Sequence, residues 1–340
     1  MVLVPVDSVR RQALAALGMA GVPASHAETQ VALLLDAELR GVPSHGLLRL
    51  ERLVHRIGNG VANAETKGRH SWRGTGFLAV DGERGLGPVV ALAAIEALLP
   101  RARENGVAIA AIANSNHIGM LAWYAEKIAA QGFAAIVMTT SEALVHPWGG
   151  YRALVGTNPI AIGVPTAGQP FVMDTATGVV SMGKIHDHAH RKAPIPQGWA
   201  LDRDGNPTTD AEAAKLGAIS PMAEGKGYAL GLAIELLVSA LTGAALGTDV
   251  KGTLDATAVC NKGDIFIVLN PAAGVAQSLS AYLDLVRASP PAKGFDRVLL
   301  PGDRSAATRE SRLRDGLPVA DEVWQRMLAL TGAKVEGEPA

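Results

Sequence analysis

Apolar positions recur at helical spacing over the first part of the chain. Residues 7–20 and 25–40 are predicted helices, and the second opens with the capping-box pattern Ser25-His26-Ala27-Glu28. Ser44 is a preferred N-cap residue, so a third helix is predicted from there to about Ile57. Their apolar positions include Val31, Leu34, Leu35, Leu47, Leu50 and Val54. The chain therefore opens with a helical segment that cannot bury its apolar faces without a partner.

The pattern then changes to short apolar runs that alternate with helices. The predicted elements are a strand at 76–82, a helix at 88–103, and continuous apolar, hence buried, strands at 107–113 and 133–140. Asn114-Ser115-Asn116 can cap a helix that runs to Gln131, with His117 in its first turn. This order of elements is that of a βαβ unit with parallel strands.

The rest of the chain mixes strands, helices and a long polar stretch. Strands are predicted at 159–165, 171–174 and 265–269, helices at 224–246, 274–288 and 320–330, and loops over 186–210. The pattern predicts an α/β protein with a helical domain in 1–72, an α/β cofactor-binding domain in 73–275, and C-terminal helices in 276–340 that return to the helical domain. The helix at 224–246 is a candidate to pack on the helical domain instead of its own.

Composition narrows the class of protein. The chain has 340 residues, a net charge of -1 and no long basic run, which argues against a nucleic-acid partner. A lone cysteine, Cys260, excludes a disulfide framework and a cysteine-based metal cluster. The first residues lack the pattern of a signal peptide, and apolar runs are interrupted by charges or glycines. We expect a cytoplasmic protein without a membrane span.

One dinucleotide fingerprint is present but out of context. Residues 74–79 match G-x-G-x-x-A, which binds a pyrophosphate only between a strand and a helix. Here residues 67–73 do not resemble a strand, and the residues that follow do not resemble a helix. We therefore expect no Rossmann-type site at Gly74.

The segment after Ser44 carries the first candidate chemistry. His45, Arg49, Arg52 and Arg56 fall on one helical face. An imidazole one turn from a guanidinium can move a proton beside a carboxylate that the guanidinium binds. A solvated basic face is the plainer interpretation, and it suits Arg52 and Arg56 in particular.

A second candidate follows the strand at 107–113. Backbone N–H groups at a helix start attract anions, so residues 114–119 could bind a cofactor phosphate. The helix dipole would disfavour a charged His117 and keep it neutral, as a general base requires. Simple capping of the helix is the alternative.

Other polar residues stand at turns or strand ends. Thr157 offers a hydroxyl in a tight turn, Asp174 ends a strand, and Lys184 and Lys226 each lie beside a glycine. His186, His188 and His190 alternate as on a strand face, but the segment is polar and loop-like, so we expect no metal site. A nucleophilic hydrolase is not supported, because G-x-S-x-G is absent.

Seven motifs in order carry a family resemblance over about residues 8–330: Arg40-Gly41…Ser44-His45-Gly46…Arg49, Asn114-Ser115-Asn116-His117-Ile118-Gly119, Gly156-Thr157-Asn158-Pro159, Asp174-x-Ala176…Gly183-Lys184-Ile185, Ile195-Pro196-Gln197-Gly198-Trp199-Ala200, Pro207-Thr208-Thr209-Asp210 and Gly225-Lys226-Gly227-Tyr228. Together they resemble the type II malate/L-lactate dehydrogenase family. That family includes malate, sulfolactate, ureidoglycolate and diketogulonate oxidoreductases and ketimine reductases.

The resemblance implies a fold and a set of roles. It implies a non-Rossmann, mixed-sheet domain that binds NAD or NADP, and a homodimer acting on a small carboxylate substrate. Ser44 and His45 would relay a proton, with His117 as a second acid/base candidate. Arg49, Thr157 and Lys184 would bind substrate. The cofactor would contact His117, Ile118, Gly119, Met120, Leu121, Ser141, Asp174, Thr175, Ala176, Lys226, Pro301, Gly302 and Arg304.

Departures from the family pattern leave some questions open. The residues at 141–148, 221–224 and 268–273 differ from the usual motifs where cofactor contacts are expected, so the choice between NADH and NADPH stays open. Ketimine reductases often carry an acid where this chain has Lys184, which favours 2-hydroxy acid and 2-oxo acid chemistry. The alternatives are a reductase of cyclic imine carboxylates and a nucleotide-binding protein without catalysis.

Overall fold

The N-terminal helices form largely where the apolar pattern places them. The structure is a computed structural model that describes residues 1–332. Helix α1 spans Val6–Met19 and α2 spans Ala24–Leu39, close to the predicted bounds. The predicted capping box at Ser25 does not form, because the N-cap residue of α2 is Pro23 and no side chain caps the helix. Helix α3 spans only Leu50–Gly58, because Pro43–His45 and Leu47–Arg49 form two 3-10 turns, η1 and η2. The prediction of a helix from Ser44 is therefore wrong at its start.

Gly46 separates the two turns. Its backbone is not helical (φ -99°, ψ -139°), and the Glu38 carboxylate accepts the N–H of Leu47 at 2.9 Å. A side chain at Gly46 would collide with that carboxylate. Residues 43–49 thus wrap closely around Glu38 of α2, which is what shapes this segment as turns.

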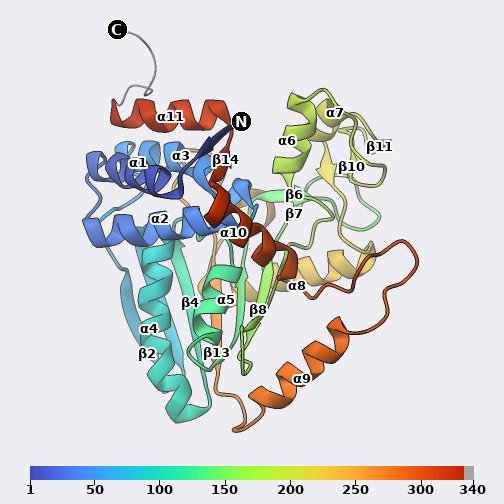
Figure 1. The fold of residues 1–340 in the computed structure, drawn as a ribbon. Coiled ribbons are helices and arrows are strands. Elements are labelled where there is room, and N and C mark those ends of the chain that lie inside the picture. Colours follow the sequence, from blue (N-terminus) through green and yellow to red (C-terminus); the bar gives the residue numbers. More distant parts are fainter. Residues whose placement is uncertain (333–340) are drawn as a thin grey trace.

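Elements from the C-terminal end cover the N-terminal helices (Figure 1). Helix α10 (Asp303–Asp315), absent from the sequence prediction, packs on α2, and α11 (Asp321–Thr331) packs on α1 and α3. Strand β1 (Val2–Val4) pairs antiparallel with β14 (Leu317–Val319). Their shared core includes Val4, Val9, Leu17, Leu317 and Met327. Both ends of the chain therefore build one helical unit.

Helix α9 (Ala276–Arg287) differs from the prediction that all C-terminal helices return to this unit. It lies at the opposite end of the molecule from α11 (Figure 1) and contacts the turn after Val164: the Ala167 N–H is donated to the Ala276 carbonyl oxygen and the Ser280 hydroxyl. The division at 72/73 and 275/276 stays a prediction.

The central layer is a seven-stranded mixed sheet with the order β2-β3-β4-β13-β5-β8-β9. Its strands are β2 (Arg69–Arg73), β3 (Phe77–Gly85), β4 (Val107–Ser115), β5 (Ala134–Thr139), β8 (Ile160–Val164), β9 (Phe171–Thr175) and β13 (Asp264–Leu269). Only β3 and β4 pair in parallel. Strands β4 and β5 run in the same direction, as predicted for the unit at 107–113 and 133–140, because β13 is antiparallel to both. They are not hydrogen-bonded to each other, since β13 lies between them.

Strand β2 corrects a second expectation. Residues 69–73 were expected not to form a strand, yet they pair with β3 in an antiparallel hairpin at the edge of the sheet. Their side chains are mostly exposed, so the strand has no apolar pattern to reveal it. The glycines at 74 and 76 belong to the hairpin turn, and a strand follows them, which agrees with the absence of a Rossmann-type site there.

Helices cover both faces of the sheet. Helices α4 (Gly87–Asn105) and α5 (Ala122–Ala129) share one core with alternate β4 residues such as Ala110 and Ile112. Helix α8 (Gly225–Thr242) covers the other face, where Ile234 and Val238 pack on Ala111 of β4. The helix predicted at 224–246 therefore packs on the sheet and not on the helical unit.

Helix α8 is also, among residues 1–332, the one helix long and apolar enough to cross a membrane by length and composition. Its Glu235 is buried and accepts hydrogen bonds from Asn158 Nδ2 (2.7 Å) and the Gly156 N–H (3.2 Å). The expectation of no membrane partner stays a prediction.

A smaller five-stranded sheet forms a separate lobe (Figure 1). Its order is β11 (Pro207–Thr208), β10 (Ala200–Leu201), β12 (Ala218–Ile219), β6 (Ala143–Val145) and β7 (Val155–Gly156), with α6 (Met182–His190) and α7 (Ala211–Lys215) packed beside it. The predicted loop at 186–210 is therefore wrong over its first residues, because Ile185 and Ala189 are the buried side of a helix. Within the described residues no cluster of potential metal ligands forms, including at the three histidines.

Candidate active site

The two 3-10 turns bring the first candidate residues into contact. The Ser44 hydroxyl lies 3.0 Å from His45 Nδ1, and Arg49 Nε donates to the Ser44 carbonyl oxygen at 2.9 Å. All three side chains are half-buried. The side chains thus meet as the helical spacing predicted, although the backbone between them is not an α-helix.

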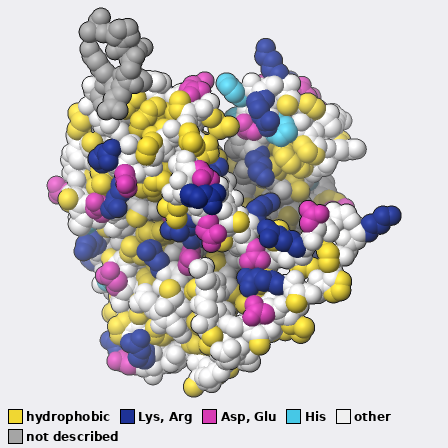
Figure 2. Space-filling view, in the orientation of Figure 1, with side chains coloured by type: hydrophobic (Ala, Val, Ile, Leu, Met, Phe, Trp, Pro, Cys, Tyr) yellow, Lys and Arg dark blue, Asp and Glu magenta, His cyan; other side chains and the backbone are white. Residues whose placement is uncertain are grey.

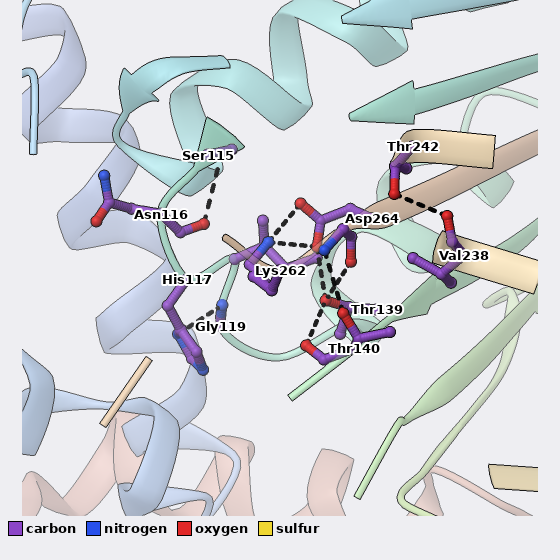
Figure 3. Close-up of polar contacts among 12 residues, drawn as sticks. Ser115, Asn116, His117, Gly119, Thr139, Thr140, Val238, Thr242, Lys262 and Asp264 are labelled. Atoms are coloured by element: carbon purple, nitrogen blue, oxygen red, sulfur yellow. Dashed lines mark hydrogen bonds and ion pairs between the residues drawn. The ribbon is translucent and has the colours of Figure 1, made fainter. Parts of the chain in front are cut away.

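His117 reaches the same place from the sheet. Strand β4 continues to Ser115 and α5 begins only at Ala122, so His117 lies in a loop and not in the first turn of a helix. Its ring centroid is 5.5 Å from that of His45. The Gly119 N–H is donated to His117 Nδ1 at 3.0 Å (Figure 3). Two imidazoles and a guanidinium, 72 residues apart in the chain at most, therefore form one cluster.

Both imidazoles are held neutral near pH 7. Burial, and then the charge of Arg49, lowers the pKa of His45 to about 4. Burial lowers the pKa of His117 well below its usual value, and Arg49 and His45 add to the effect. The low pKa of His117 thus has burial and nearby cations as its causes. The helix start that the sequence predicts at His117 is absent, because α5 begins at Ala122.

Arg49 is also bound by a segment that the sequence did not single out. Its Nη1 donates to the Thr253 carbonyl oxygen at 2.7 Å. The Glu142 carboxylate accepts the backbone and hydroxyl protons of Thr253 and the N–H of Leu254 at 2.8–2.9 Å. Burial, followed by the charge of Arg52, lowers the pKa of Arg49 to about 10, so it stays charged. Residues 250–258 therefore close one side of the site.

Ser141, the residue before Glu142, contacts Thr157. The Ser141 hydroxyl is 3.1 Å from Thr157 Oγ1 and accepts the Thr157 N–H at 2.9 Å. Asn158 is fully buried and donates to Glu235 of α8. The turn at Thr157 is thus held by Ser141 on one side and by Glu235 on the other. Ser141, predicted to contact the cofactor, and Thr157, predicted to contact the substrate, are direct neighbours.

Several predicted cofactor residues also become neighbours. Asp174 on β9 accepts the N–H of Ala122, the first residue of α5 after the Ile118–Leu121 turn, at 2.7 Å. A Cβ on Gly302 would lie 3.2 Å from the Val172 carbonyl oxygen, which places the start of α10 beside β9. The Asp174 carboxylate is exposed at the start of α5. A carboxylate in such a place can accept hydrogen bonds from the hydroxyls of a ribose. These residues therefore fit a nicotinamide dinucleotide.

Two predicted lysines lie apart from these contacts. Lys226 is exposed at the start of α8, where its neighbour Gly225 faces Trp148. Lys184 is exposed on α6, and a Cβ on the adjacent Gly183 would lie 3.4 Å from Ser44 Cβ, so this helix faces the cluster. The molecular surface is hollowed between the helical unit and the lobe that carries α6 and α7 (Figure 2).

A buried ion pair that sequence reasoning missed lies to one side of the His117 loop (Figure 3). Lys262 and Asp264 are 1% and 0% exposed and bind each other through both carboxylate oxygens. Thr139 Oγ1 donates to Asp264 at 2.6 Å, and the Gly263 N–H is donated to Thr140 Oγ1 at 3.1 Å. The sequence pattern that could have indicated this pair is Lys262 and Asp264, two opposite charges directly before the apolar run Ile265–Leu269. The bonds of Asp264 to Thr139 and of Gly263 to Thr140 join the start of β13 to the end of β5.

Replacing Lys262 by methionine is expected to lower the free energy of unfolding by about 3–5 kcal/mol. Asp264 would then be buried without its cation. Chemical denaturation measures the loss. The double variant Lys262→Met, Asp264→Leu removes both charges and should recover most of it; a double variant as unstable as the single one would show that the stranded charge is not the cause.

The chain is similar in sequence to known dehydrogenases. The malate/L-lactate dehydrogenase family matches residues 4–328. The chain is 35% identical to the (2R)-3-sulfolactate dehydrogenase (NADP(+)) of Chromohalobacter salexigens, covering 95% of this chain and 96% of that protein. It is 33% identical to the ureidoglycolate dehydrogenase (NAD(+)) of Escherichia coli, covering 92% and 91%.

A solved structure shows the same fold. The crystal structure of a dehydrogenase from Sinorhizobium meliloti has a TM-score of 0.94 and 52% sequence identity, covering 97% of this chain and 98% of that one. The mixed sheet and the helical unit built from both chain ends are therefore the fold of these proteins.

Proposed function

The chain belongs to the malate/L-lactate dehydrogenase family, an NAD- or NADP-dependent group of oxidoreductases, and we propose that it interconverts a small 2-hydroxy acid and its 2-oxo acid with His45 as the proton carrier. The observation that carries this proposal is the pair of neutral imidazoles beside the half-buried Arg49. A bound nicotinamide supplies the hydride acceptor or donor. We propose that Ile118 to Leu121, Asp174 and the turn at Pro301 to Arg304 would hold it.

Arg49 has the free donors that a carboxylate needs. A guanidinium carries five N–H groups, and among residues 1–332 Arg49 uses one on Nε and one on Nη1. Three remain, on Nη1 and Nη2, and they form the edge that matches a carboxylate in two-point fashion. The bonds to Ser44 and Thr253 orient that edge before substrate binds. The Arg49 side chain therefore loses little conformational entropy on binding.

Hydrogen bonds support different roles for the two histidines. Nδ1 of His117 accepts the Gly119 N–H, so the neutral ring carries its proton on Nε2. In that state Nε2 donates a hydrogen bond and cannot accept a proton. Nδ1 of His45 faces a hydroxyl, which accepts as readily as it donates, so His45 can present an unprotonated Nε2.

We therefore infer that His45 removes the hydroxyl proton in oxidation, with Ser44 stabilising the charged ring, and returns it in reduction. His117 donates a hydrogen bond from Nε2 to the substrate oxygen and polarises it. Thr157 and Lys184 are proposed substrate contacts, and Ser141, Thr175, Ala176 and Lys226 are proposed cofactor contacts.

A panel of 2-oxo acids and cyclic imine carboxylates, each tested with NADH and with NADPH, checks the proposal. We expect cofactor oxidation, followed by its absorbance at 340 nm, with at least one 2-oxo acid. Turnover of cyclic imines alone would instead identify a ketimine reductase. Cofactor binding without any turnover would favour a nucleotide-binding protein that is not an enzyme.

A cytoplasmic homodimer belongs to the same proposal. The free thiol of Cys260, which is buried, supports the proposed cytoplasmic location. The dimer is supported by Leu236 and Leu237 of α8, which are exposed. A second copy of the chain would cover such leucines. Sedimentation equilibrium would contradict the dimer if it gave the mass of one 35.2 kDa chain.

A further inference from the structure

The two 3-10 turns of the proposed site meet at Leu47, whose N–H group leaves the backbone pattern. In a continuous helix this N–H would be donated to the carbonyl oxygen of Pro43, four residues earlier. That oxygen instead accepts the Gly46 N–H at 3.1 Å, and the Leu47 N–H is donated to Oε1 of Glu38 at 2.9 Å. A side chain from α2 therefore replaces a backbone acceptor at the break between η1 and η2.

The Glu38 carboxylate is buried for this contact. The residue is 5% exposed, and burial raises the pKa of its carboxyl group. Among residues 1–332 the carboxylate has no ion-pair partner within 4.0 Å, and Leu47 is the one residue that donates a hydrogen bond to it. Burying a carboxylate is unfavourable unless partners replace the lost water. The few partners of Glu38 point to a role in placing the turn.

Helix α10 fixes the end of α2 from which Glu38 projects. Arg312 donates from Nη1 to the Glu38 carbonyl oxygen, and its charge opposes part of the effect of burial on the pKa of Glu38. Arg309 Nε donates to Asp36 Oδ1 at 3.0 Å, and Arg40 Nε donates to Asp36 Oδ2 at 2.6 Å. Three arginines thus hold the backbone that presents the Glu38 carboxylate.

Gly46 leaves room for that carboxylate. A Cβ on Gly46 would collide with Glu38 Oε1 and lie 2.7 Å from its Cδ, so the carboxylate packs directly against the Gly46 backbone. On the other side of the turn, Leu47 and Leu50 are 1% and 0% exposed and belong to the core of the helical unit. The start of η2 is therefore held between Glu38 and the core.

The break sets the direction in which the two turns present their side chains. Ser44 and His45 belong to η1 and Arg49 belongs to η2, and Arg49 Nε donates to the Ser44 carbonyl oxygen. Without its acceptor, the buried Leu47 N–H would be satisfied only if the segment changed shape, which moves His45 relative to Arg49. A displacement of about 1 Å in a reacting group costs on the order of 100-fold in rate.

We propose that Glu38 is a positioning residue of the reaction, which accepts the Leu47 N–H and thereby holds His45 and Arg49 in place for the substrate. This inference rests on the proposed function of the site. The role needs the acceptor oxygen and not the charge. Because no group in residues 1–332 donates to Oε2, a glutamine would place its NH2 group there without meeting another donor.

Steady-state kinetics of two variants tests the role. Glu38→Met keeps the length and helix propensity of the side chain but removes the acceptor. It should lower kcat/KM for the 2-oxo acid that the panel identifies by about 10- to 100-fold. Glu38→Gln keeps the acceptor and should stay within about threefold of the wild type, since a neutral hydrogen bond is weaker than a charged one. The KM for NADH and NADPH should stay near the wild-type value in both variants.

Leu17→Ala separates positioning from stability. Leu17 is 0% exposed in the core of the same helical unit, so this variant should unfold at a lower temperature but keep the wild-type kcat and KM where it is folded. Wild-type kinetics in Glu38→Met, equal losses in Glu38→Met and Glu38→Gln, or the same kinetic loss in Leu17→Ala would each overturn the inference. If Glu38→Met does not fold, Gly46→Ala displaces the carboxylate instead and should show the same loss, and wild-type kinetics there would overturn it.

NMR titration of His45 provides a readout that needs no turnover. The pKa of His45 is about 4, so its ring signals, identified by their absence from His45→Gln, should change little between about pH 5 and pH 8. Glu38→Met should move this pKa toward the ordinary value of about 6.5, and Glu38→Gln should not. A His45 titration that Glu38→Met leaves unchanged would overturn the inference. The expected titrations in a protein that turns over no member of the panel would retain the positioning role and overturn the proposed reaction.

Discussion

Replacing His45 by glutamine is expected to lower kcat about 10²- to 10⁴-fold, the range of a positioned general acid or base. Glutamine can hydrogen-bond to the substrate but cannot exchange a proton with it. His45 contacts Ser44, whereas the proposed cofactor residue Asp174 binds the start of α5. The KM for NADH or NADPH should therefore stay near the wild-type value. Steady-state kinetics in both directions measures the effect.

His117→Gln is the matched control. A glutamine amide can still donate to the substrate oxygen as Nε2–H of His117 does, so its kcat should fall only about tenfold. Ser44→Ala should lie between the two variants, because it removes the hydroxyl that faces His45 Nδ1 at 3.0 Å. A large loss in His117→Gln with near-normal turnover in His45→Gln would exchange the two roles.

The pH dependence adds a check on the same assignment. Oxidation of the 2-hydroxy acid requires unprotonated His45, and the pKa of this ring in the free protein is about 4. The value of kcat/KM for oxidation should therefore be constant through neutral pH and fall as the pH drops toward 4. An enzyme with an unperturbed histidine would lose activity already near pH 6.5.

The proposed catalytic cluster could be predicted from the sequence because its residues lie in two short motifs. Ser44, His45 and Arg49 lie within six consecutive residues. Such short spacing brings them together both in an α-helix and in the two 3-10 turns that form here. His117 was placed with them by family resemblance. Its surroundings were not predictable, because burial and the charge of Arg49 depend on how the sheet meets the helical unit.

The residues that were missed act across long distances in the chain. Glu142 and Thr253 meet through a contact over 111 residues, and Thr139 and Asp264 through one over 125. The same reason explains β13, which enters the sheet between two strands that precede it by more than 100 residues. Apolar periodicity reports whether a segment is a strand, but it carries no information on which strand will be its neighbour.

Polar segments were misjudged for a different reason. Edge strand β2 and helix α6 have few buried side chains, so their periodic signal is weak. Arg56 shows the reverse error: the residue is expected in solvent, but its side chain is buried, with Nε donating to Asn116 and Nη1 to the Asp255 carbonyl oxygen. Within residues 1–332 its Nη2 is buried without a hydrogen-bond partner. A buried arginine is stable where neighbouring oxygens accept its protons, and a sequence does not show those oxygens.

Replacing Arg49 by methionine is expected to raise the KM for the 2-oxo acid roughly 10- to 100-fold, because two charge-assisted hydrogen bonds to its carboxylate are lost. The KM for NADH or NADPH should be unchanged. Arg49 also donates to Ser44 and Thr253, so its removal could loosen residues 250–258 as well. Arg49→Lys separates the two effects, since it keeps the charge but loses the planar fork.

If Arg49 binds the carboxylate, the lysine variant should have a KM between those of wild type and Arg49→Met, and all three proteins should unfold at similar temperatures. A methionine variant with a lower unfolding temperature, a raised cofactor KM and a normal substrate KM would make Arg49 a structural link between η1 and residues 250–258. The carboxylate would then have to be bound elsewhere, and Arg52, whose charge acts on Arg49, is a candidate for that role.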